Sequence, residues 1–262
     1  MSADSSENVV LVENRERVLW ITINRPNRRN ALNQAVLDGL HTALRRLHND
    51  RDLLAGVLTG AGEAAFCAGA DLEPGKSFQW DYTRPNAPLA DLIRLARNSP
   101  IPLIARVNGA CMAGGIALAA ACPLAIAADD AKFGVPEIKV GIFAMQVFAC
   151  LQALVPAKQL YEWCVTGEPF DAHAAKAAGL LNHVVPRAQL DAQVQALIAR
   201  IVDKSPVAMR RGIYAMQAAS SMDFDQSLAY MESQVSTISL TEDAREGIAA
   251  FAEKRKPVWK GR

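Results

Sequence analysis

Short apolar runs alternate with helical patterns along the first half of the chain. VVLV at 9–12 and VLWITI at 18–23 predict two strands joined by a polar turn at 13–16. Leucine and valine then recur at helical spacing over 33–48, with Asn33 as the N-terminal cap. Further apolar runs predict short buried strands: AGVLTG at 55–60, LIARV at 103–107 and LAIAA at 124–128.

The order of these elements favours an α/β fold. Continuous apolar strands indicate a parallel or mixed sheet that is buried on both faces. A segment at 73–99, rich in proline and aromatic residues, interrupts the pattern, and its last part predicts a helix at 89–97. After about residue 143 the pattern becomes helical, with helices expected at 157–165 and after the caps Asp171, Ser205 and Thr241. We expect an α/β core over 1–203 and a C-terminal helical region over 204–262.

The composition excludes several classes of protein. Hydrophobic residues make up 51% of the 262 residues and the net charge is +1, which rules out disorder for most of the chain and argues against a nucleic-acid-binding protein. The uncharged run at 107–128 is long enough to span a bilayer, but it contains glycines and Pro123 and consists mainly of alanine. We therefore predict that this run is core and that the chain does not bind membranes.

Cysteine and histidine usage indicates neither disulfides nor a metal site. The five cysteines are scattered without a Cys-x-x-Cys pair, which is typical of reduced core thiols in a cytoplasmic protein. The four histidines share no metal-ligand spacing, and the polar, acidic N-terminus does not resemble a secretory signal. Motifs for a P-loop, a dinucleotide-binding turn, a serine nucleophile elbow and a zinc protease are absent from the sequence.

Two turns rich in glycine and alanine follow predicted strands. FCAGADL at 66–72 comes after the strand that ends at Thr59, and NGACMAGG at 108–115 comes directly after the strand that ends at Val107. Small side chains expose the backbone N–H groups where a helix begins, and two such groups pointing at one oxygen would form an oxyanion hole. Taken singly, each segment is better interpreted as a tight turn.

With these turns and four further segments, nearly the whole chain resembles the crotonase superfamily, the enoyl-CoA hydratase/isomerase enzymes. The similar segments occur in the order of the family: NRPNRRNAL at 24–32, FCAGADL at 66–72, VNGACMAGG at 107–115, KFGVPEIKVGI at 132–142, TGEPFDAHAAKAAGLLNHVVP at 166–186 and EGIAAFAEKRKPVWKGR at 246–262. The resemblance implies a crotonase-like spiral of ββα turns with a helical C-terminal oligomerisation region, assembled as a homotrimer or a dimer of trimers.

The resemblance also implies the ligand and the residues that bind it. Members act on acyl-CoA thioesters, so coenzyme A enters as part of the substrate and no tightly bound cofactor is expected. The backbone N–H groups of Ala70 and Gly114 are the expected oxyanion donors. The expected coenzyme A-binding residues are Arg28, Ala31, Ala68, Gly69, Asp71, Leu72 and Lys254.

The resemblance implies that Glu137 is the acid–base residue. It follows Pro136 and precedes an apolar strip, and a carboxylate in an apolar pocket can have its pKa raised toward neutrality, which suits a proton shuttle. Without the resemblance, a surface glutamate at the start of a strand is the more ordinary interpretation. Phe143 and Met145 would line an acyl pocket, with Trp80 in a lid, although the same residues are also compatible with plain core packing.

The sequence departs from the hydratase pattern at one position. Hydratases of the family carry a second glutamate three residues after the equivalent of Gly114, where this chain has Ala117. Two carboxylates activate water for addition, whereas one suffices to move a proton, as in Δ3,Δ2-enoyl-CoA isomerases. The isomerase is therefore favoured; a hydratase with another second acid and a non-catalytic acyl-CoA-binding pseudoenzyme stay open.

Local charge is uneven despite the near-neutral total. Residues 24–32 contain three arginines and no acid, and residues 251–262 contain five basic residues and one glutamate. Cationic side chains pair with phosphates such as those of coenzyme A. Both clusters are also compatible with ordinary solvated surface, and the resemblance assigns Arg28 and Lys254 to the coenzyme A phosphates.

Overall fold

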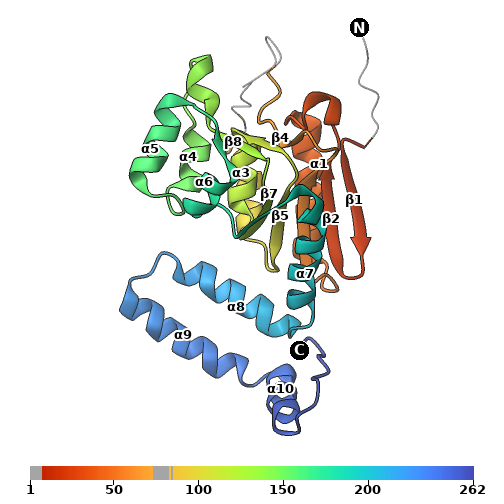
Figure 1. Ribbon diagram of the computed structural model, residues 1–262. Helices are drawn as coiled ribbons and strands as arrows, with labels where there is room; N and C mark the ends of the chain where they lie inside the picture. The colour runs from red at the N-terminus through yellow and green to blue at the C-terminus, as the bar shows by residue number, and fades with distance from the viewer. Residues whose placement is uncertain (1–7, 73–82, 84) are drawn as a thin grey trace. The chain divides into compact units, whose positions relative to one another are not determined.

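The computed structural model describes residues 8–72, 83 and 85–262 (Figure 1). The chain divides into two compact units, residues 1–196 and 197–262. The sequence pattern predicts the change of architecture slightly later, after residue 203. The first unit contains the sheets, and the second contains helices and the C-terminal tail.

A six-stranded sheet forms the centre of the first unit. Its strands in spatial order are β1 (Val10–Arg15), β2 (Val18–Ile23), β3 (Ala55–Gly60), β5 (Leu103–Val107), β7 (Leu124–Ala128) and β10 (His183–Val185). β1 pairs antiparallel with β2, and the other neighbours are parallel. All six residues of β3 are buried, which agrees with the expected mixed sheet covered on both faces.

A second, smaller sheet was not predicted from the sequence. Its strands in spatial order are β4 (Ala65–Cys67), β6 (Ala110–Met112), β8 (Lys132–Gly134) and β9 (Phe170–Asp171). β4, β6 and β8 are mutually parallel, and β9 is antiparallel to β8. Strands of two or three residues have too few positions to show a hydrophobic period, so their pairing is visible only in the folded chain.

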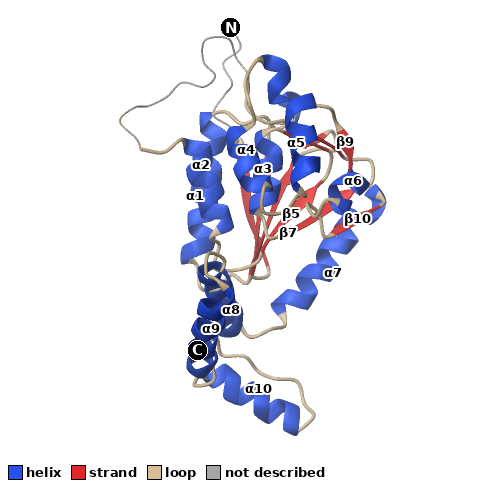
Figure 2. Ribbon diagram, turned by 90° about the vertical axis from the view of Figure 1, so that its left-hand side faces the viewer, coloured by secondary structure: helices blue, strands red, loops and turns tan. Residues whose placement is uncertain are grey.

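Helices cover the sheets of the first unit (Figure 2). Asn33 caps α1 as predicted, because its side chain accepts a 3.0 Å hydrogen bond from Val36 N. In chain order, α1 packs on α2, α2 on α3 and α3 on α4. The α-helices are α1 (Gln34–Asn49), α2 (Pro88–Arg97), α3 (Gly114–Ala121), α4 (Met145–Leu151), α5 (Ala157–Thr166), α6 (Ala172–Ala177) and α7 (Leu190–Val202); the 3-10 helices are η1 (Pro26–Arg28), η2 (Pro136–Val140) and η3 (Arg187–Gln189).

The uncharged run at 107–128 is core, as predicted. It comprises the end of β5, then β6, α3 and β7, and seven of the eight residues of α3 are buried. Over the described residues, none of the helices combines the length and the apolar character needed to cross a bilayer. All five cysteines are free thiols, and four of them are buried.

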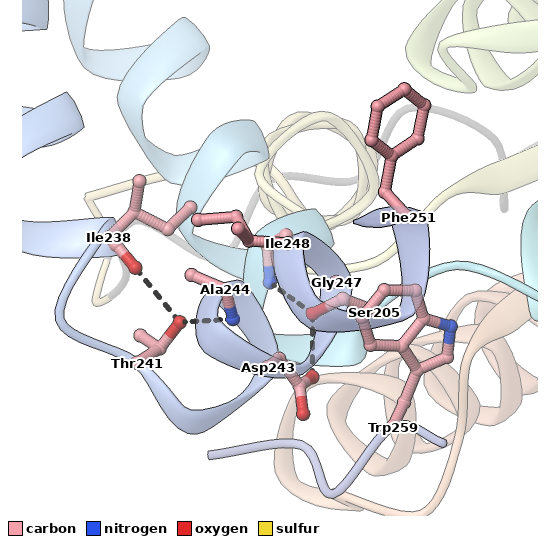
Figure 3. A pocket seen from close by; sticks show the side chains of 10 residues that line it. Ser205, Ile238, Thr241, Asp243, Ala244, Gly247, Ile248, Phe251 and Trp259 are labelled. Carbon is pink, nitrogen blue, oxygen red and sulfur yellow. Dashed lines mark hydrogen bonds between the residues drawn. The ribbon is translucent and has the colours of Figure 1, made fainter. Parts of the chain in front are cut away.

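The second unit contains α8 (Pro206–Ala219), α9 (Phe224–Ile238) and α10 (Glu242–Ala252). Ser205 and Thr241 cap α8 and α10 as predicted. Buried Asp243 fixes the tail, since it accepts hydrogen bonds from Ser205 Oγ at 2.6 Å and from Lys260 N at 2.7 Å. A pocket of about 360 Å³ lies beside this carboxylate, with Ile238, Ile248 and Trp259 among its lining side chains (Figure 3).

Candidate active site

Three segments of the first unit follow the carboxyl ends of neighbouring parallel strands. Residues 68–70 follow β4, residues 113–114 follow β6, and residues 135–137 follow β8. Because carboxyl ends of parallel strands meet at one edge of a sheet, the three segments come together there. The small sheet thus gathers both expected oxyanion segments and the expected acid–base residue.

The first two segments touch at Gly69 and Gly114. A Cβ atom on Gly69 would lie 2.7 Å from Ala113 Cβ and 3.4 Å from Gly114 N, while a Cβ atom on Gly114 would lie 3.8 Å from Gly69 Cα. Gly69 also has φ +90°, which L side chains rarely adopt. Glycine at position 69 therefore serves both the backbone conformation and the close approach of the two turns.

The N–H group of Ala70 points away from the segment with which this residue pairs. Leu32 forms a parallel bridge with Ala70: its N–H donates to Gly69 O at 2.8 Å, and its carbonyl accepts from Asp71 N at 2.9 Å. In a parallel bridge the central residue turns its own N–H to the opposite side. Ala70 is exposed, so its N–H can reach a ligand at the surface.

Gly114 begins α3, where the N–H groups lack carbonyl partners within the helix. The preceding Ala113 has φ +50° and ψ −122°, and its N–H donates to Gly134 O at 3.0 Å across to β8. This uncommon conformation turns the chain abruptly from β6 into α3. A Cβ on Gly115 would lie 2.3 Å from Cys67 O, so α3 begins directly against the end of β4.

Glu137 is half-buried on η2, a 3-10 helix, and does not begin a strand. Its Oε2 atom is buried and has no hydrogen-bond partner among the described residues. Burial raises the pKa of Glu137, and a hydrogen bond to its own backbone partly opposes this. Burial, and after it the Glu137 charge, raises the pKa of the Cys164 thiol on α5, the helix against which η2 packs.

The model of the family described as "Enoyl-CoA hydratase/isomerase" matches residues 13–262. The chain belongs to this family. A short-chain-enoyl-CoA hydratase of Clostridium acetobutylicum is 34% identical over 95% of this chain and 96% of that protein, and the Bacillus subtilis protein named "Putative enoyl-CoA hydratase/isomerase YngF" is 32% identical over 97% and 99%. The crystal structure of a Mycobacterium smegmatis enoyl-CoA hydratase matches with a TM-score of 0.92 and 36% identity, covering 97% of this chain and 99% of that one.

The crotonase fold is thereby confirmed, together with the C-terminal helices that the resemblance implied. Within this fold, Ala117 occupies the second turn of α3 and is completely buried. Among the described residues, burial and its own backbone shift the pKa of Glu137, and neither is a second carboxylate. Trp80, the expected lid residue, lies outside the described residues.

The Asp71 carboxylate forms salt bridges with two arginines. Its side chain accepts from Arg25 at 2.8 Å and from Arg28 at 3.0 Å, and Arg25 also donates to Ala31 O at 2.8 Å. The side chains of Arg25 and Asp71 are only 6% and 9% exposed, whereas that of Arg28 is 53% exposed. Asp71 therefore offsets part of the positive charge that the sequence shows at 24–32.

The remaining expected ligand contacts are located as follows. Ala31 is buried and Ala68 is half-buried, whereas Leu72, Phe143 and Met145 are exposed. Lys254 follows α10 in the second unit and is exposed. Within the described part of the chain, His, Cys, Asp and Glu side chains form no group suited to hold a metal ion.

Three polar residues that shape this region were not predicted from the sequence. Arg25 is buried as the partner of Asp71, and Asn30 and Asn108 place their amides beneath the start of β4. The only sequence signal was their place within the family-like segments, because a polar residue in a turn looks the same whether it is solvated or buried. Their roles depend on partners more than thirty residues away.

Proposed function

We propose that this protein is an enoyl-CoA isomerase that moves a proton from C2 to C4 of a 3-enoyl-CoA thioester. The observation that carries the proposal is the partly buried carboxylate of Glu137, whose Oε2 has no hydrogen-bond partner among the described residues, at the sheet edge that also holds Ala70 and Gly114. Burial raises the pKa of Glu137, which makes its carboxylate a stronger base and suits it to accept a proton and return it.

In the first step the thioester carbonyl oxygen accepts hydrogen bonds from Ala70 N–H and Gly114 N–H. The Glu137 carboxylate removes a proton from C2, and the electrons of that C–H bond form a dienolate whose negative charge lies largely on the oxygen. Preorganised amides favour this charge more than the neutral carbonyl, and losing one such donor costs about 3–4 kcal/mol in other enzymes.

In the second step the protonated Glu137 returns its proton to C4. The double bond then lies between C2 and C3, the carbonyl is restored, and Glu137 is again a carboxylate. No water enters the balance, so a second carboxylate is unnecessary. Ala117, buried and aliphatic, suits this reaction because it supplies no second carboxylate at this position of α3.

Substitution of Glu137 by glutamine tests the proposal on 3-hexenoyl-CoA. Glutamine keeps the shape of the side chain but cannot accept the proton, so we expect kcat to fall about 100-fold or more. Glu168→Gln is the matched control, since Glu168 is exposed and pairs with Lys139 of η2 at 2.7 Å. An unchanged kcat for Glu137→Gln would reject the carboxylate as the base.

Hydration of 2-enoyl-CoA is the second candidate function. It is favoured by the names of relatives, which include the Clostridium acetobutylicum short-chain-enoyl-CoA hydratase and a Thauera aromatica (E)-benzylidenesuccinyl-CoA hydratase that is 30% identical. Hydration would require a second acid beside Glu137 to activate the water. Acyl-CoA binding without turnover of either substrate would instead identify a pseudoenzyme.

We further propose that the chain forms a homotrimer or a dimer of trimers in the cytoplasm. Large apolar side chains of the second unit are exposed, including Phe251 at 87%, Phe224 at 78% and Ile248 at 72%. Exposed apolar side chains favour association when they gather in one patch, and Ile248 and Phe251 both line the apolar pocket in Figure 3. Light scattering after gel filtration tests the assembly; a monomer at micromolar concentration would contradict it.

A further inference from the structure

Two buried asparagine amides converge on one carbonyl group at the start of β4. Asn30 Nδ2 donates to Ala65 O at 2.7 Å, and Asn108 Nδ2 donates to the same oxygen at 3.2 Å. Asn30 is completely buried and Asn108 is 1% exposed. The two residues come from different turns, one before α1 and one after β5.

Asn30 uses both ends of its amide. Its Nδ2 also donates to Ala61 O at 3.0 Å, and its Oδ1 accepts from Arg25 N at 3.0 Å. The residue has φ +55°, a left-handed conformation that asparagine tolerates better than most side chains. The orientation of this amide is therefore fixed by partners on both sides.

Asn108 is fixed in the same way. Its Nδ2 donates to Gly62 O at 2.6 Å, and its Oδ1 accepts from Gly60 N at 3.2 Å and from Thr59 Oγ1 at 3.3 Å. Gly60 leaves no room for adjustment, since a Cβ there would lie 2.5 Å from both Ala65 O and Asn30 Nδ2. The end of β3 is thus packed against the start of β4.

The two amides hold the first residue of β4, while the buried side chain of Phe66 and the pairing with β6 hold the rest of the strand. The strand has three residues, and its pairing with β6 shifts register between Ala65 and Cys67. Cys67 O touches the start of α3 at Gly115, and Ala70 follows three residues later. A displacement at Ala65 would therefore change the distance between the N–H groups of Ala70 and Gly114.

We infer that Asn30 and Asn108 are positioning residues for the oxyanion site: by holding Ala65 O they set the spacing of the two N–H donors. The inference rests on the proposed use of Ala70 and Gly114 as those donors. Neither asparagine contacts the reacting atoms. Each acts through β4, and a misplacement of about 1 Å at a catalytic group can cost about 100-fold in rate.

The test measures how strongly the site polarises a thioester. Butyryl-CoA labelled with ¹³C at its carbonyl cannot isomerise, and the infrared stretch of this carbonyl moves to lower frequency when its oxygen accepts stronger hydrogen bonds. The variants are Asn30→Asp and Asn108→Asp, which keep the size and the acceptor oxygen but lose the N–H donors to Ala65 O. Asn30→Ser and Asn108→Ser repeat the test without the buried charge, should that charge prevent folding.

The control is Ser99→Ala, which loses a 2.7 Å hydrogen bond from buried Ser99 Oγ to Ile101 O, before β5 begins. We expect the asparagine variants to lower kcat on 3-hexenoyl-CoA about tenfold or more, with KM within about twofold, and to return the carbonyl band toward its frequency in water. Ser99→Ala should be less stable than wild type but should keep the wild-type carbonyl frequency and kcat.

The outcomes separate the two levels of the argument. A wild-type band that does not move on binding would reject the proposed oxyanion donors themselves. If the carbonyl band moves on binding to wild type, and the folded asparagine variants show the same shift and the same kcat, only the positioning role is overturned.

Discussion

Gly69 faces Ala113 so closely that a methyl group on Gly69 would lie 2.7 Å from Ala113 Cβ. Both residues also have positive φ angles, +90° and +50°. The two turns that carry the proposed oxyanion donors are therefore in direct contact, and any side chain at position 69 would push them apart. This contact explains why the chain needs glycine at a place where the sequence alone shows only a small-residue turn.

Gly69→Ala should abolish most of the activity. We expect kcat/KM on 3-hexenoyl-CoA to fall about 100-fold or more, because the added methyl group separates the two N–H donors. Gly62→Ala is a matched control: Gly62 has φ +73°, but its nearest neighbour would be Pro26 Cβ at 3.5 Å. The control should lose about 1–2 kcal/mol of stability and keep its kcat. Equal kinetic losses in both variants would contradict the role of the contact.

Glu137→Gln should make the protein more stable at neutral pH. Burial raises the pKa of Glu137 above the ordinary value of 4.5, so in the window between these values the native state holds more protons than the unfolded state. Stability from this group is therefore present below the unfolded pKa and lost as pH rises through the folded pKa. Thermal midpoints across pH should show the glutamine variant above wild type at neutral pH, and the gap should shrink on acidification.

The exposed Glu168→Gln serves again as the control for that series and should follow the wild-type curve. A Glu137→Gln protein that is less stable than wild type at neutral pH would show that the carboxylate is stabilised by its surroundings. That result would contradict the conclusion that burial raises the pKa of Glu137.

Removing one partner of the buried Arg25–Asp71 pair should be strongly destabilising. The two side chains are 6% and 9% exposed, so Arg25→Met removes the buried partner of Asp71 and leaves its pair with Arg28. The loss should approach, without exceeding, the roughly 3–5 kcal/mol that is usual when a buried charge loses its partner. Arg15→Met removes a pair whose side chains are 51% and 61% exposed and should cost at most about 1 kcal/mol. Urea unfolding measures both; equal midpoints for the two variants would contradict the buried pair.

Arg28→Ala should weaken the binding of coenzyme A esters more than the binding of the corresponding pantetheine thioesters. The Arg28 side chain is 53% exposed while it holds Asp71, so it can also approach a phosphate. Lys254→Ala should act in the same direction. Inhibition constants of both ligand series measure the difference, with Arg46→Ala on α1 as the control. Equal losses for the two series would place Arg28 away from the phosphates.

The strongly periodic elements were predictable from the sequence. Helix α1, with its Asn33 cap, and strands β3, β5 and β7 form where apolar spacing and turn residues indicate them. The turn expected at 13–16 instead continues β1 to Arg15, because cross-strand pairing with Val18 extends the strand. Local pattern decides such elements, and tertiary pairing decides their ends.

The candidate site was predictable only in part. The family-like segments indicate Ala70, Gly114 and Glu137, but the small sheet that assembles them consists of strands too short for any periodicity. The positive φ of Ala113 and the burial of Asn30 depend on partners distant in sequence. Glu137 lies on a 3-10 helix held against α5, an arrangement that no local spacing specifies.

The most direct measurement of the central claim is the turnover of 3-hexenoyl-CoA and 2-hexenoyl-CoA by the wild-type protein in H₂¹⁸O, with products resolved by mass. A single-carboxylate isomerase should convert the 3-enoyl thioester to the 2-enoyl thioester without incorporating ¹⁸O, and should leave the 2-enoyl thioester largely unhydrated. Rapid formation of ¹⁸O-labelled 3-hydroxyhexanoyl-CoA from the 2-enoyl substrate would contradict the account and identify a hydratase.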